Sequence, residues 1–69
     1  MHATRVWTIE ANMSAGALQL LAAEALGYQP GVTAGAWASV SGLGGNQPPK
    51  WMIELSKQLA ARGIKHALY

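Results

Sequence analysis

The order of apolar and polar residues predicts two helices. From Ser14 to Leu26, apolar residues recur with the three- and four-residue spacing of a helix that buries one face. Ser14 suits the N-cap, because its side-chain oxygen can accept a backbone N–H of the first turn, and Gly27 suits the left-handed residue that follows a helix. A second amphipathic helix is expected from Pro48 to Arg62, since proline is tolerated in a first turn whose N–H groups have no partner.

Other segments show the period of two that is typical of strands. The stretch near Arg5–Glu10 is rich in β-branched and aromatic residues and divides into two alternating faces, which predicts an N-terminal strand. Residues 64–69 resume alternation and predict a short closing strand. Val32–Ser41 fits both a strand and a helix, and the pattern does not separate them. Gly42–Gly45 is interpreted as a connector. We therefore predict an α+β fold, a small single domain over residues 1–69 with two main helices and an N-terminal strand. The alternative is an all-α helix-turn-helix domain in which Val32–Ser41 is the middle helix.

The size and composition of the chain favour association. Sixty-nine residues are near the lower limit for a domain with one core, and the chain has no Cys, which excludes disulfides and thiolate metal sites. Self-association or a partner is the ordinary remaining way to bury more surface. The lack of Cys is also typical of a cytoplasmic protein. The apolar stretch Leu18–Leu26 is too short to cross a bilayer, and no secretory signal opens the chain, so we expect no membrane partner.

The stretch Gly42–Lys50 raises the question of nucleotide binding. A phosphate-binding loop needs a Gly-Lys-Ser/Thr ending, but here Lys50 follows two prolines, which have no N–H to donate, and Trp51 occupies the hydroxyl position. The spacing therefore argues against a phosphate cradle.

Few residues are suited to catalysis or to metal binding. The chain has no Asp, three Glu on separate elements, and two His. His2, His66 and Glu10 would form a metal site only if the first and last strands were neighbours, and they lack motif spacing. Ser14 is better explained as a cap than as a nucleophile. We expect no enzyme, no metal, no cofactor and no small-molecule substrate.

Three stretches between Leu21 and Leu59 carry a resemblance to a known family. "LAAEALGYQPG" matches a motif helix and turn, "TAGAWASVSG" stands in the place of a recognition helix, and "QPPKWMIELSKQL" matches a following helix that opens with Pro. The chain in this region resembles Cro and lambda-repressor-type helix-turn-helix proteins. The resemblance implies binding to duplex DNA, with contacts from Thr33, Ser39, Lys50, Lys57 and Arg62.

The same segment favours protein binding over DNA binding. Between Gly31 and Gly45 there is no Arg, Lys, Asn or Gln, the side chains that read base edges. The net charge of +2 is far from the basic surface of a nucleic-acid-binding domain. We therefore predict a non-catalytic protein-binding module, such as a small assembly subunit, an adaptor or a phage-type inhibitor, with DNA binding as the alternative. A membrane-active peptide of the bacteriocin kind is a distant alternative.

Tryptophan and the residues around it define the predicted interface. Trp and Tyr are the residue types that most often anchor protein interfaces, and Trp37 lies among small residues that allow close approach. If its segment is a strand, Thr33, Trp37 and Ser41 share one face. These three residues are the predicted interface, and a homodimer or a complex with another protein is the expected state.

Overall fold

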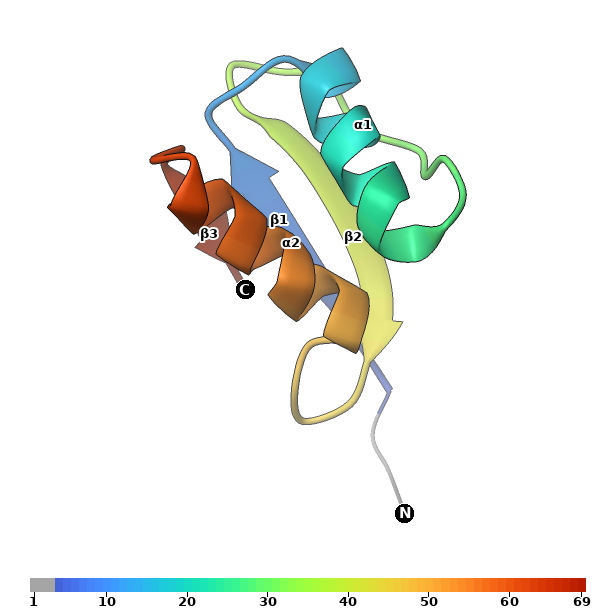
Figure 1. The fold of residues 1–69 in the computed structure, drawn as a ribbon. Helices are drawn as coiled ribbons and strands as arrows, with labels where there is room; N and C mark the ends of the chain where they lie inside the picture. Colours follow the sequence, from blue (N-terminus) through green and yellow to red (C-terminus); the bar gives the residue numbers. More distant parts are fainter. Residues whose placement is uncertain (1–3) are drawn as a thin grey trace.

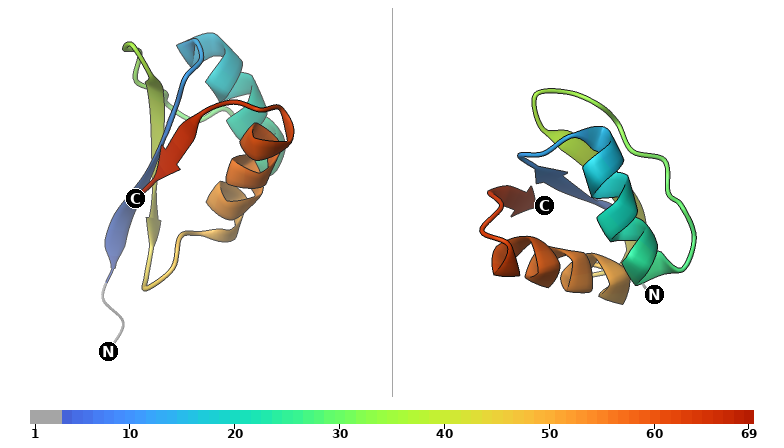
Figure 2. Two further views of the ribbon diagram at one scale, coloured as in Figure 1. Left: turned by 90° about the vertical axis from the view of Figure 1, so that its left-hand side faces the viewer. Right: turned by 45° about the horizontal axis from the view of Figure 1, so that its top comes forward.

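Three strands form one antiparallel sheet, and both helices pack on the same face of it. The computed structural model describes residues 4–69. In chain order the elements are β1 (Arg5–Ala11), α1 (Ala15–Leu26), β2 (Ala38–Gly44), α2 (Lys50–Ala61) and β3 (His66–Leu68). β1 is the central strand, and β2 and β3 pair with it on either side. The helices cover one face of the sheet, and no described segment covers the other (Figures 1 and 2). The α+β fold expected from the sequence is confirmed.

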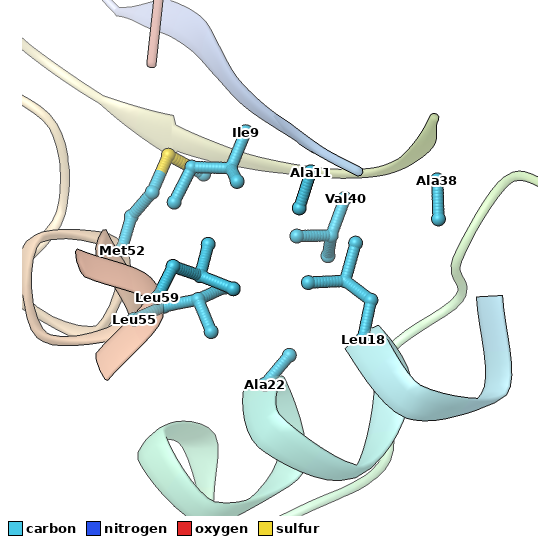
Figure 3. Close-up of a cluster of buried hydrophobic side chains, with 9 residues drawn as sticks. All are labelled: Ile9, Ala11, Leu18, Ala22, Ala38, Val40, Met52, Leu55 and Leu59. Carbon is cyan, nitrogen blue, oxygen red and sulfur yellow. The ribbon is translucent and has the colours of Figure 1, made fainter. Parts of the chain in front are cut away.

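The core lies between the sheet and the helices. Along β1, Ile9 and Ala11 are buried, whereas Val6 is exposed, so the alternation of the sequence is the alternation of the two sheet faces. Each long element contributes to one apolar cluster (Figure 3), which consists of Ile9, Ala11, Leu18, Ala22, Ala38, Val40, Met52, Leu55 and Leu59. Three of the nine members are alanines, which leaves the core small.

The ends of α1 follow the capping chemistry expected from the sequence. Ser14 is extended, and its side-chain oxygen accepts the N–H of Ala17 at 3.2 Å. Gly27 has a φ of 82°, in the left-handed region, and its N–H reaches the carbonyl of Ala23 at 2.8 Å. Both predicted caps are confirmed. Each depends on a side chain or a backbone conformation that few other residue types offer.

The start of α2 differs from the expectation that the prolines lie in its first turn. The helix begins at Lys50, and Pro49 is the N-cap residue in an extended conformation, with φ −62° and ψ 153°. A residue that precedes proline is driven out of the helical region, so Pro48 cannot begin the helix. At the other end Arg62 is the C-cap residue, and Gly63 follows with a φ of 67°.

The segment whose pattern was ambiguous is neither one strand nor a helix. Residues 35–37 form bends, Thr33 makes an isolated antiparallel bridge to Ser39, and β2 begins at Ala38. The all-α alternative is therefore wrong. The interpretation of Gly42–Gly45 as a connector is also wrong, because Gly42, Leu43 and Gly44 belong to β2.

Candidate functional site

The glycines of β2 make room for two tryptophan rings. A Cβ added to Gly42 would lie 2.5 Å from Cζ2 of Trp51, and a Cβ added to Gly44 would lie 2.9 Å from Cδ1 of Trp7. Nε1 of Trp7 also donates to the carbonyl of Gly45 at 3.1 Å. Because both rings pack directly against β2, larger residues at these positions would displace them. The glycines serve the packing of the sheet rather than a phosphate site.

The uncovered face of the sheet carries a mixed set of side chains in matched pairs. Val6 lies opposite Leu43, and Thr8 lies opposite Ser41, with 2.9 Å between the two hydroxyl oxygens. Val6 and Leu43 are 60% and 67% exposed, which makes them the most open apolar pair on the sheet. This face therefore presents apolar and hydroxyl groups and, within the three strands, one charged side chain.

That charge belongs to Glu10 in the central strand. The hydroxyl of Tyr69 donates to the Glu10 carboxylate. This hydrogen bond is the main cause that raises the pKa of Tyr69 above its ordinary value of 10.0, and desolvation and the negative charge of Glu10 act in the same direction. The contact fastens the end of the described chain to β1.

Within the described part of the chain, one half of the outer edge of β2 has no strand paired to it. Thr8 exchanges backbone hydrogen bonds with Tyr69, at 2.7 and 2.9 Å, so its N–H and C=O point toward β3. Because paired residues in an antiparallel ladder alternate between bonded and non-bonded pairs, Ser41 opposite Thr8 directs its own N–H and C=O away from β1. Leu43, two residues farther along, has the same orientation. These four backbone groups face outward from the sheet.

The other half of this edge is already covered. Thr33 and Ser39 exchange two backbone hydrogen bonds, at 2.9 and 3.0 Å. In Figure 1 the loop before β2 runs beside the start of the strand, and among residues 4–69 no segment pairs with its arrowhead half on the side away from β1. We call the open half, Ser41 to Gly44, the free edge.

The predicted interface residues are divided between the two halves. Ser41 belongs to the free edge, and Thr33 covers the other half through its bridge to Ser39. Trp37 lies in the bend before β2 and is 37% exposed, whereas Trp7 and Trp51 are partly buried against the core. The common face of Thr33, Trp37 and Ser41 that a single strand would have produced does not exist, because the chain folds back between Thr33 and Ser39.

The predicted DNA contacts do not lie on one surface. Lys50 and Lys57 are exposed on α2, and Arg62 at its C-terminal end bonds to Gln58 through Nη1. Thr33 and Ser39 lie at the outer edge of the sheet, whereas α2 packs on β1 and β3. The segment that would have been the recognition helix is a loop followed by a strand.

The residues considered for a metal site are also separated. Glu10 faces the uncovered side of the sheet, and His66, one register position away in β3, faces α2. His2 lies outside the described residues. Over the described range 4–69, no three His, Cys, Asp or Glu side chains come together as a metal site requires.

His66 takes part in a contact that the sequence pattern did not predict. Its Nδ1 lies 2.9 Å from the carbonyl of Ile64, and its Nε2 lies 2.8 Å from Oγ of Ser56. A carbonyl only accepts, so Nδ1 carries a proton, and in the neutral imidazole Nε2 then accepts from the Ser56 hydroxyl. A serine beside an oriented imidazole is also the first requirement of a nucleophile. Here Ser56 lies inside α2, where the backbone N–H groups bond within the helix and offer no second donor to a reacting carbonyl, so the contact is better explained as a link between α2 and β3.

The free edge could not be identified from local sequence. Its residues alternate as in any strand, and the direction of their backbone groups depends on which strand lies on each side.

In residues 4–69 no helix has the length and the apolar character needed to cross a membrane. Comparison with protein-family models, curated proteins and solved structures gives no match.

Proposed function

We propose that this protein is a non-catalytic protein-binding module that takes up an extended segment of a partner at the free edge of β2. The observation that carries the proposal is the outward orientation of the backbone groups of Ser41 and Leu43. An edge strand of this kind is a template for another strand, and added strands bind through main-chain hydrogen bonds.

The composition of the free edge supports this proposal. Natural edges are usually protected by Lys, Pro, charges or a covering segment. Here the covering segment ends at Thr33, and the sequence from Ser39 to Asn46 contains no charged residue and no Pro. Beside the edge, Leu43 offers an exposed apolar side chain to a partner. Trp37, at the covered half, remains a proposed additional contact for a longer partner segment, because aromatic residues often anchor interfaces.

The lack of Cys in the sequence fits a cytoplasmic location, which we include in the proposal.

The test compares three forms of the protein as bait in native extract, with and without nuclease. Ser41→Pro removes an outward N–H that takes no part in the ladder with β1, so the sheet should persist while strand addition is blocked. Ser41→Ala is the matched control, because it also loses the hydroxyl bond to Thr8 but keeps the N–H. We expect a protein that wild type and Ser41→Ala retain and that Ser41→Pro loses. In the purified complex the amide of Leu43 should be protected from hydrogen exchange.

Two results would contradict the proposal. The first is a partner that binds Ser41→Pro as tightly as wild type. The second is a retained species that nuclease removes and that binds less tightly as salt rises, with a slope of about −0.9 per phosphate contact on a double-logarithmic plot. That result would point to duplex DNA and to the lysines of α2.

A further inference from the structure

We infer that the segment which pairs with the free edge is the same edge of a second copy, related by a two-fold axis that passes beside Gly42. This inference rests on the proposed function and names its partner. Two copies of β2 would run antiparallel, and the two three-stranded sheets would become one continuous sheet with all four helices on one face.

The register follows from which backbone groups are open. With Gly42 opposite Gly42 of the second copy, Ser41 lies opposite Leu43 of that copy, and Leu43 lies opposite its Ser41. These are the residues with outward N–H and C=O groups, so both pairs are hydrogen-bonded pairs and supply about four bonds. In the same register Ser39 would meet residue 45 of the second copy, where the chain has already left β2. The bridge from Thr33 to Ser39 in one copy therefore leaves the pairing of Ser41 and Leu43 with the second copy unobstructed.

Small side chains allow this pairing at the axis. Gly42 has no Cβ, and the ring of Trp51 lies above it on the helix side of the sheet. In the paired dimer the two Trp51 rings lie on the same side of the sheet, each above its own Gly42, and the two Gly42 residues lie opposite each other. On the uncovered side each Leu43 packs beside Ser41 of the other copy. The axis thus brings together apolar surface on both faces.

The uncharged edge and the small core favour a second copy as the occupant. The net charge of +2 is low, and Ser39 to Asn46 contains no charged side chain that would face its own copy across the axis. The core of one copy is small, and three of its nine members are alanines. A standard interface covers about 800 Å² of each partner, or about a fifth of the 4380 Å² that one copy exposes. The free edge supplies four residues of each copy, Ser41 to Gly44, fewer than the roughly 20–30 of a standard interface, which predicts a reversible dimer of low affinity.

The test is sedimentation equilibrium of four proteins from about 10 µM to about 1 mM, the range in which small interfaces associate. Wild type should move from a mass near 7.3 kDa toward twice that value as the concentration rises. Ser41→Pro should stay monomeric. Leu43→Lys should also stay monomeric, because it places like charges on diagonal neighbours across the axis. Leu20→Lys is the matched control, since Leu20 is a similarly exposed leucine (64%) on α1, and it should dimerise like wild type.

The outcomes separate this inference from the proposed function. Wild type that remains monomeric over the whole range would overturn the second-copy inference, while the bait comparison would still decide the proposed function. A dimer that survives both Ser41→Pro and Leu43→Lys would overturn the edge register, because it would have to use another surface. If Ser41→Pro fails to fold, Leu43→Lys decides alone, since an exposed leucine can be replaced without loss of core.

Discussion

Replacement of Gly42 by alanine tests whether β2 contains glycine in order to receive Trp51. The added Cβ would lie 2.5 Å from Cζ2, 3.2 Å from Cε2 and 3.4 Å from Nε1 of the indole. Overpacking of this kind costs about 1–3 kcal/mol. Alanine also recovers about 0.5–1 kcal/mol, because glycine loses more backbone freedom on folding. The net loss should be about 1–2 kcal/mol, since Trp51 is only partly buried and its ring can shift.

The assay is thermal and urea unfolding at low protein concentration, where a dimer does not contribute. For a domain of this size each kcal/mol corresponds to about 4–8 °C, so Gly42→Ala should lower the Tm by about 4–16 °C. Gly16→Ala is the control, because nothing lies within 4 Å of the added Cβ. It lies in a helix, where alanine is about 1 kcal/mol better than glycine, so it should raise the Tm.

The same substitution in a protein that lacks the Trp51 ring identifies the cause of the lost stability. In a Trp51→Leu protein the clash is absent, and Gly42→Ala should then cost nothing or stabilise slightly. Contacting residues show coupling energies of about 0.5–3 kcal/mol in such a cycle. An equal loss in both backgrounds, or a Gly42→Ala protein as stable as wild type, would refute the explanation of the glycine.

Three further substitutions test separate contacts. Ser14→Ala should lower the free energy of unfolding by about 1 kcal/mol, measured in urea, because the cap of α1 is lost. Ser56→Ala should cost about 1 kcal/mol in the same assay through the lost bond to His66, and an unchanged stability would show that this bond does not hold β3. Glu10→Gln should lower the pKa of Tyr69 toward 10.0 in a tyrosinate absorbance titration, because it removes the charged acceptor. Since the fold raises this pKa, the stability from the contact is present below pH 10 and is lost as the pH rises through the raised value.

Much of the architecture could be predicted because local chemistry determines it. Ser14 and Gly27 bound α1 through a side-chain oxygen and a positive φ, and the alternation around Ile9 matches the two faces of β1. These features depend on residues that are near one another in the sequence. The α+β fold class followed from them.

The errors concern β2, where long-range packing decides the structure. Gly42 and Gly44 are read locally as a flexible connector, but they form a strand because they pair with β1, far away in the sequence, and leave room for the rings of Trp51 and Trp7. The open half of the edge depends on where the bridge from Thr33 ends, which no local pattern encodes. The candidate site therefore required the structure. Trp37 was predicted as an anchor from its residue type and its small neighbours alone, and that role stays a prediction.

Amide hydrogen exchange along β2, measured by NMR at two protein concentrations, tests the account most directly. At low concentration Val40 and Gly42 should exchange slowly, since their N–H groups bond to β1, and Ser41 and Leu43 should exchange quickly. At high concentration the amides of Ser41 and Leu43 should become protected, while that of Ser39, bonded to Thr33, is protected at both. Protection of Ser41 and Leu43 in the dilute monomer, or fast exchange of both in a sample that sedimentation shows to be dimeric, would contradict the free edge as the binding site.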